Sequence, residues 1–111
     1  MHAQKGVTYQ SLKDKESSFA YRIKKDIPRT FPDNNFFKEN EKERQRNLLN
    51  ILLAYSNFDP EVGYTQGMNF LVATLIYHVH LEQIEKDYFV IDNDFEEDVF
   101  WIFVYIMDNK Q

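Results

Sequence analysis

Glycine and proline are scarce in this chain of 111 residues, and their positions constrain its fold more than any other feature of the sequence. Each occurs three times, which is about half the combined share of an average protein. Five of the six fall in two short windows, residues 28–32 and 60–67. Because β-sandwiches and barrels need many tight turns, which these residue types form best, the scarcity favours helices joined by two main loops.

The spacing of the apolar residues predicts five helices around these windows. They cover about residues 9–14, 18–27, 39–56, 66 or 68 to 80, and 95–108. In the second helix Ser17 or Ser18 is placed to cap the start, and Pro28 ends it because the residue before a proline disfavours the α conformation. Residues 29–35 are then a loop. The chain is therefore predicted to be all-α, an irregular bundle of short to medium helices.

The third and the last of these helices differ in how their apolar residues are distributed. The third has charged residues in its first half and leucines in its second, so its start should face solvent and its end should be buried. In the last, Asp94 and Glu97 are spaced as a capping box. Residues 99–107 are apolar around the whole circumference, which is typical of burial on several sides. We therefore expect another chain, or elements downstream of residue 111, to cover this segment; left exposed, it would offer a surface for association.

Charge, cysteine content and hydropathy exclude several classes of protein. A net charge of −5 and a pI near 5.1 have the wrong sign for a broad phosphate-binding surface, so no nucleic-acid partner is expected. The lack of cysteine rules out disulfides and thiol nucleophiles and suits a reducing compartment. The N-terminus has no apolar signal core, and no apolar stretch reaches the roughly 20 residues that cross a bilayer. We expect a soluble, cytoplasmic protein without a transmembrane segment.

Familiar nucleotide-binding and metal-binding motifs are missing from the sequence. It contains no G-x-x-x-x-G-K-[ST], G-x-G-x-x-G or G-x-S-x-G, so it is not predicted to bind a nucleotide by a known loop. His78 and His80 are two residues apart and would point to different faces of a helix, which argues against a shared metal ion. The acidic run at residues 92–98 lacks the calcium-loop pattern and is interpreted as capping of the last helix.

Two short segments, one in each window, contain the candidate chemistry. In the first, Asp26-Ile27-Pro28-Arg29, an arginine follows a helix end; alone, such a residue is usually a surface charge or part of a local salt bridge. In the second, residues 63–69, Gln66 lies between two glycines at the start of a helix, where the usual interpretation is capping. Gly67 would allow a partner to approach the backbone, and Gln66 offers both an acceptor and donors on one short side chain.

Together the two segments resemble the signature of the TBC domain, the helical GTPase-activating domain that acts on Rab-family small GTPases. Residues 23–32, Ile-Lys-Lys-Asp-Ile-Pro-Arg-Thr-Phe-Pro, are similar to the family's I-x-x-D-x-x-R-T-x-P segment. Residues 64–69, Tyr-Thr-Gln-Gly-Met-Asn, are similar to its Y-x-Q-G-M-N segment. The resemblance covers residues 6–109 and only the N-terminal half of such a domain, which leaves residues 1–5 as a tail.

This resemblance implies that the chain assists GTP hydrolysis in trans and is not itself a hydrolase. Arg29 matches the arginine finger of the family, and Gln66 matches the glutamine finger that takes over from the GTPase's own glutamine. Other matching positions would orient the fingers and shape their loops: Asp26, Thr30, Tyr64, Gly67 and Asn69. The implied partner is a GTP-bound Rab protein, which brings GTP and Mg²⁺ with it, so no cofactor of the chain's own is implied.

Two other interpretations of the sequence stay open. The chain is alternatively a truncated or isoform TBC fragment without GTPase-activating activity, which acts at most as a helical GTPase-binding or interaction module. The exposed apolar helix at residues 99–107 would favour association. It is otherwise an unrelated helical adaptor. If the Rab interpretation holds, the protein is expected in the cytoplasm, peripheral to endomembranes through its GTPase partner.

Overall fold

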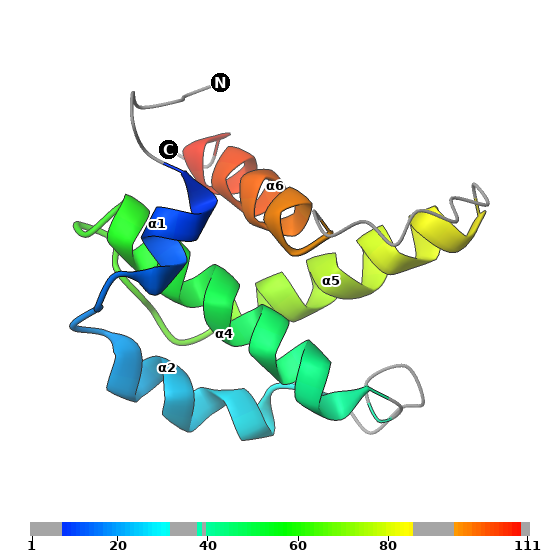
Figure 1. Ribbon diagram of the computed structural model, residues 1–111, viewed down its shortest axis with the longest axis horizontal. Coiled ribbons are helices and arrows are strands. Elements are labelled where there is room, and N and C mark those ends of the chain that lie inside the picture. The colour runs from blue at the N-terminus through cyan, green and yellow to red at the C-terminus, as the bar shows by residue number, and fades with distance from the viewer. Residues whose placement is uncertain (1–7, 32–37, 39, 86–94, 110–111) are drawn as a thin grey trace.

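Helix α4, Glu41–Phe58, lies at the centre of the structure, and the other helices pack around it (Figure 1). The computed structural model describes residues 8–31, 38, 40–85 and 95–109. Around α4 lie α1 (Tyr9–Asp14), α2 (Ala20–Asp26), the 3-10 turn η1 (Ile27–Arg29), α5 (Met68–Glu85) and α6 (Phe95–Asn109). In Figure 1, α1 and α6 are above α4 and α2 is below it. The described residues form helices and no strand, which confirms the predicted all-α fold.

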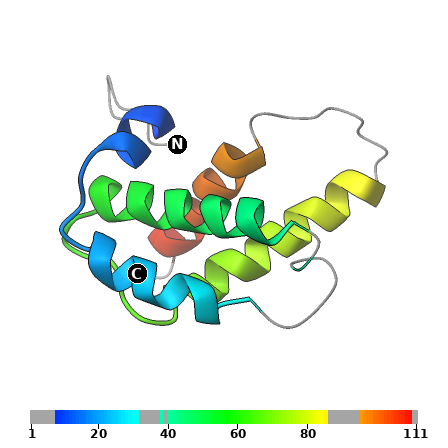
Figure 2. The same ribbon diagram turned by 60° about the horizontal axis from the view of Figure 1, so that its bottom comes forward.

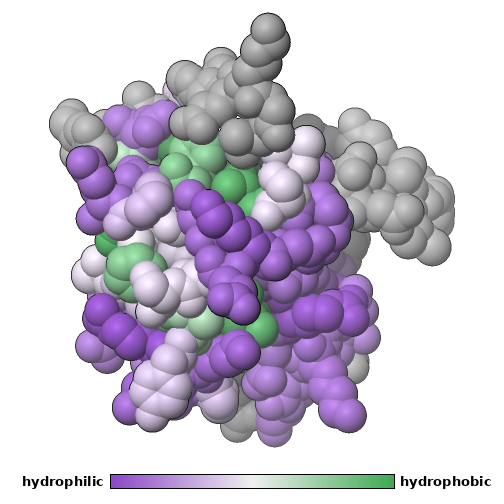
Figure 3. Space-filling model, turned by 60° about the vertical axis from the view of Figure 1, so that its left-hand side comes forward, coloured by the Kyte–Doolittle hydropathy of each residue, from purple (hydrophilic) through white to green (hydrophobic). Residues whose placement is uncertain are grey.

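The central position of α4 follows from the distribution of its side chains. Residues 41–43 are exposed, whereas Leu48, Ile51 and Leu52 are fully buried. The predicted contrast between a solvated start and a buried end is therefore confirmed. Turning the molecule shows α2 running beside α4 on the opposite side from α1 (Figure 2). On the side that faces left in Figure 1, hydrophilic residues cover most of the coloured surface and hydrophobic ones fill gaps between them (Figure 3).

Aromatic rings join α1, α4 and α6 in the core. Phe100 and Phe103 of α6 are fully buried. The ring of Phe100 lies 5.0 Å from that of Tyr9 in α1, and the ring of Phe103 lies 4.9 Å from that of Tyr55 in α4, centroid to centroid. Such tilted and edge-on pairs add to the stabilisation from buried area alone. Because α4 also positions α2 and α5, this cluster supports both predicted functional segments.

A glutamate at the start of α6 links the same three helices. Glu96 accepts hydrogen bonds from the Tyr9 hydroxyl at 2.5 Å and from Asn47 Nδ2 at 2.7 Å, and Lys13 Nζ lies 3.8 Å away. Burial, followed by the hydrogen bond to Glu96, raises the pKa of Tyr9 well above its usual range. The phenol therefore remains a donor, and the carboxylate is compensated on both oxygens.

Helix α6 buries one face and leaves the other partly exposed. Val99 and Val104 are buried together with the two phenylalanines, whereas Ile102 is 39% and Tyr105 is 70% exposed. The sequence predicted burial of α6 on several sides, but the described residues bury only one side of it. An exposed apolar edge remains on α6, as the sequence led us to consider.

Several predicted boundaries differ from those observed. Helix α2 ends at Asp26, and Pro28 lies in the first turn of η1, where its missing N–H costs no hydrogen bond. Arg29 is thus the last residue of a 3-10 turn and not part of an extended loop. Helix α5 continues to Glu85 instead of ending at residue 80, because residues 81–85 contain no helix breaker.

The starts of two helices also differ from prediction. The N-cap of α2 is Phe19, which makes no side-chain cap bond, although the Ser17 hydroxyl accepts a hydrogen bond from the Phe19 N–H at 3.1 Å. Asp94 lies outside the described residues, as does the tail at residues 1–5. Glu97 accepts a hydrogen bond from Trp101 Nε1 at 2.9 Å. None of the helices in the described ranges is long and apolar enough to span a membrane.

Candidate functional site

Arg29 reaches solvent from the end of η1 while one of its nitrogens is held in place. Its side chain is 67% exposed, and Nη2 donates to Asp26 Oδ1 at 2.8 Å. The 3-10 turn sets this geometry, because side chains three residues apart lie on the same side of such a turn. The remaining guanidinium N–H groups are left for an anion presented from outside.

Asp26 is the buried acceptor that fixes this arginine. The residue is 9% exposed, and its second oxygen, Oδ2, accepts a hydrogen bond of 2.5 Å from the Tyr64 hydroxyl. The hydrogen bond from Tyr64, followed by that from Arg29, lowers the pKa of Asp26. Burial and the bond to Asp26 raise the pKa of Tyr64. The pair therefore exists as carboxylate and neutral phenol, the combination that gives a charge-assisted hydrogen bond.

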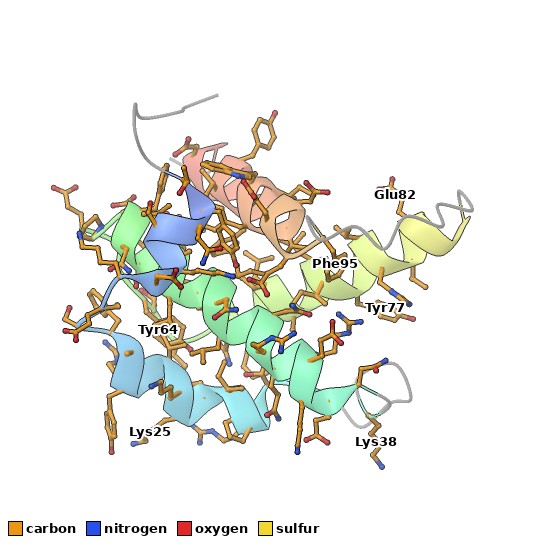
Figure 4. The ribbon with its side chains drawn as sticks, viewed as in Figure 1. Lys25, Lys38, Tyr64, Tyr77, Glu82 and Phe95 are labelled. Atoms are coloured by element: carbon orange, nitrogen blue, oxygen red, sulfur yellow. The ribbon has the colours of Figure 1, made fainter. Side chains whose placement is uncertain are left out.

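Tyr64 brings the second predicted segment against the first. Its ring is 2% exposed and lies between the loop before α5 and helix α2 (Figure 4). The guanidinium of Arg22, also in α2, lies 5.9 Å from the ring centroid, within the range of a cation–π contact. The loop containing Gln66 is therefore attached to α2 through both the hydroxyl and the face of one tyrosine.

A second connection, which we call the Thr30–Asn69 bridge, joins the same two segments. Thr30 Oγ1 donates to the Asp26 carbonyl oxygen at 2.5 Å and accepts from Asn69 Nδ2 at 2.8 Å. Asn69 Oδ1 in turn accepts from the backbone N–H of Gly67 at 3.0 Å. Thr30 is 3% and Asn69 is 2% exposed. A continuous set of buried and half-buried hydrogen bonds thus runs from the arginine turn to the residue after Gln66.

Two glycines with positive φ shape the loop of residues 63–67, which we call the glutamine loop. Gly63 has φ of 61°, and a Cβ there would lie 2.2 Å from Cζ of Phe19. Gly67 has φ of 109°, and no atom lies within 4 Å of the place its Cβ would take. Gly63 is therefore required for packing, whereas Gly67 leaves open space beside the exposed Gln66.

The structure brings together most of the residues that the sequence singled out. Asp26 and Thr30 from the first segment contact Tyr64 and Asn69 from the second, beneath the exposed Arg29 and Gln66: the seven predicted positions are Asp26, Arg29, Thr30, Tyr64, Gln66, Gly67 and Asn69. Sequence reasoning missed two contributors. Phe19 packs under Gly63, and the Met68 sulfur accepts the Thr65 N–H at 3.2 Å.

No metal-binding group of three or more His, Asp or Glu side chains occurs in the described ranges. His80 has its pKa lowered by burial first and by Arg44 second, so it is neutral near pH 7. What the site offers instead is one cationic donor group and one exposed amide, both supported from below by buried hydrogen bonds. Such an arrangement can neutralise an anion and orient a water molecule.

Comparison with protein families identifies the class to which this arrangement belongs. The model of the Rab-GTPase-TBC domain matches residues 2–111. The chain therefore belongs to the Rab-GTPase-TBC domain family, as the two segments led us to expect. No solved structure gives a significant match.

Curated relatives agree with this assignment. The chain is 36% identical to the human ecotropic viral integration site 5 protein homolog over 101 residues, 91% of this chain and 11% of that protein. It is 46% identical to the Rab GTPase-activating protein tbc-11 of Caenorhabditis elegans over 61 residues, 55% of this chain and 6% of that protein. It is 39% identical to growth hormone-regulated TBC protein 1-A of Danio rerio over 97 residues, 85% of this chain and 23% of that protein. The chain thus spans a small part of the relatives it matches.

Proposed function

We propose that this chain stimulates GTP hydrolysis by a Rab-family GTPase, with Arg29 and Gln66 acting on the partner's nucleotide. One observation supports this above all others. The two exposed side chains project from separate segments whose buried parts are joined twice, by the Asp26–Tyr64 bond and by the Thr30–Asn69 bridge. Two groups that act on one phosphate must keep a fixed spacing, and these connections supply it.

Arg29 has the chemistry needed at the transferring phosphoryl group. Negative charge spread over the γ-phosphate oxygens and the leaving oxygen has to be neutralised in the transition state. A guanidinium donates to two oxygens at once from a rigid plane, which an ammonium group does not. Since Asp26 uses one nitrogen of Arg29, it fixes the direction of the group and leaves the other donors free for phosphate.

Gln66 has the complementary chemistry for the attacking water. Its carbonyl oxygen can accept a hydrogen bond from the water while its amide donates to the γ-phosphate. The open space beside Gly67 allows the GTPase to approach this amide closely. GTP and Mg²⁺ belong to the partner. Binding to that partner would bring the protein to the membrane that carries the GTPase.

A multiple-turnover GTP hydrolysis assay with a panel of Rab proteins tests the proposal. Arg29→Lys and Gln66→Ala should each lower the stimulated rate by at least about a hundredfold, since an arginine finger is worth about 10³ to 10⁵ in Ras. Gln10→Ala, which makes the same kind of change on another exposed side chain, should leave the rate within twofold. Near-normal rates for both site variants would refute these roles.

The alternative is a TBC fragment that binds a GTPase without activating it. The exposed edge of α6, with Ile102 at 39% and Tyr105 at 70% exposure, favours it as a surface for association. Titration of the chain with Rab proteins loaded with a non-hydrolysable GTP analogue separates the two functions. Binding without any stimulation would support the fragment, and binding with stimulation that depends on Arg29 would support the activator.

A further inference from the structure

A groove of about 360 Å³ lies directly beside the arginine turn, between α2–η1 and the first half of α4. Its floor is apolar and consists of Ile27, Pro28 and Leu49. Its rim is cationic and consists of Lys24, Lys42 and Arg46, all three exposed. We call this feature the basic groove. None of the roles proposed above uses it.

The positive charge of the groove is unusual for this protein. The chain has a net charge of −5, yet residues 20–29 and 41–49 together contain seven Lys or Arg and only three Asp or Glu. Of the three acids, Asp26 is already bound by Arg29 and Tyr64. Lys25 of α2 and Lys38 before α4 extend toward the same lower edge of the molecule (Figure 4). Positive potential is therefore concentrated on one face of an acidic protein.

The three rim cations are available to an outside partner. Lys24, Lys42 and Arg46 form no ion pair with any residue that the structure describes. Their aliphatic stems extend the apolar floor while the charged ends stay in water, as is usual for long cationic side chains. The groove thus has separate places for an apolar side chain and for carboxylates around it.

The position of the groove determines which partner can fill it. Ile27 and Pro28 belong to the same 3-10 turn as Arg29. Even a fully extended arginine side chain reaches only a small fraction of the width of a protein, so a protein that presents a γ-phosphate to Arg29 has to lie against this turn. The surface of that protein next to its nucleotide would then cover the basic groove.

We propose that the basic groove binds an acidic segment of the GTP-bound GTPase, in which carboxylates flank one apolar side chain. This inference rests on the proposed function, because it takes the GTPase as the protein that covers η1. The carboxylates pair with Lys24, Lys42 and Arg46, and the apolar side chain covers Ile27 and Leu49. Charge complementarity at such a rim speeds association and selects among partners more than it changes the chemical step. The groove therefore acts on substrate choice and KM.

Charge reversal at the rim tests this inference. Lys42→Glu combined with Arg46→Glu should raise KM for the preferred GTPase about tenfold, leave kcat within twofold, and weaken the dependence of KM on ionic strength. Lys42 lies in the first turn of α4, where glutamate is favoured by the helix dipole, so folding should be unaffected. Circular dichroism checks this. Lys15→Glu, at an exposed position in the connection between α1 and α2, is the matched control and should change KM less than twofold.

Direct binding separates failure of this inference from failure of the proposed function. If the chain binds a GTPase loaded with a non-hydrolysable analogue but never stimulates hydrolysis, the proposed function is wrong; weaker binding by the charge-reversed variant would still support the groove. Unchanged KM and unchanged binding in that variant would overturn the inference. The inference would also be overturned if the chain bound no GTPase. It would be overturned as well if the charge-reversed variant lost binding only to phosphatidylserine vesicles, because the groove would then bind a membrane.

Discussion

The Thr30–Asn69 bridge can be broken almost without changing the shape of the protein. Thr30→Val replaces a hydroxyl by a methyl group of nearly the same size. The variant loses the bond of 2.5 Å to the Asp26 carbonyl and the bond of 2.8 Å from Asn69 Nδ2. Both residues are almost completely buried, so water cannot replace the lost partners without rearrangement of the loops.

The cost of this change follows from the buried donor that it leaves unpaired. An unsatisfied buried polar group costs about 1–3 kcal/mol, so we expect a loss of about 2 kcal/mol in the free energy of unfolding. For 111 residues the unfolding entropy is about 0.23 kcal/mol/K, so Tm should fall by about 9 °C. Thermal unfolding followed by circular dichroism measures this shift.

The functional consequence should exceed what the lost stability explains. At a temperature where the variant stays folded, loosening the link between the arginine turn and the glutamine loop should lower kcat by about 10- to 100-fold, with little change in KM, because misplacement of about 1 Å has effects of this size. Asn69→Leu removes the bridge from its other end. If the two residues act through one bridge, their effects are not additive. The free-energy cost of the double variant should then be about 0.5–3 kcal/mol smaller than the sum of the costs of the two single variants.

Two results would refute this reasoning. If Thr30→Val lowers Tm but leaves kcat unchanged, the bridge stabilises the fold without positioning the reacting groups. If the effects of Thr30→Val and Asn69→Leu on kcat are additive, the two residues act independently of one another. Thr30→Ser keeps the hydroxyl and should keep most of the rate, which separates the effect of the hydrogen bonds from the effect of methyl packing.

Other sites give equally specific expectations. Gly63→Ala should cost at least about 2 kcal/mol in urea unfolding, because the added methyl overlaps Phe19 at positive φ; a neutral result would contradict the packing described. Gly67→Ala meets no neighbour but puts a side chain at φ of 109°, so it should cost about 1–3 kcal/mol of stability through backbone strain and also lower the stimulated rate of the folded protein. The pKa of Asp26 is lower in the folded protein than in the unfolded chain. Ionised Asp26 therefore stabilises the fold at a pH above its ordinary pKa, and this stability is lost as the pH falls through the pKa of the folded state. Asp26→Asn should make Tm depend less on pH in this acidic range. Glu96→Gln should lower Tm without changing kcat of the folded protein, and a large loss of kcat would show coupling to the site.

The helical architecture and the two candidate functional segments could both be predicted from the sequence alone. The scarcity of glycine and proline, together with the apolar spacing, was enough for five helices, because both properties act locally along the chain. The contrast within α4 was also predictable, since its charged and apolar halves are visible in order. The two segments could be recognised because each is a short run of consecutive residues around Arg29 or Gln66.

The contact between those two segments could be found only from the packed helices. Thr30 and Asn69 are 39 residues apart in sequence, and neither periodicity nor motif spacing says that they share a hydrogen bond. The links from Glu96 to α1 and α4 span as many as 87 positions and were missed for the same reason. Such bonds depend on where packed helices bring distant side chains in three dimensions. The local sequence therefore determines which hydrogen-bonding side chains each segment has, and the packing of helices around α4 determines how far apart these side chains lie.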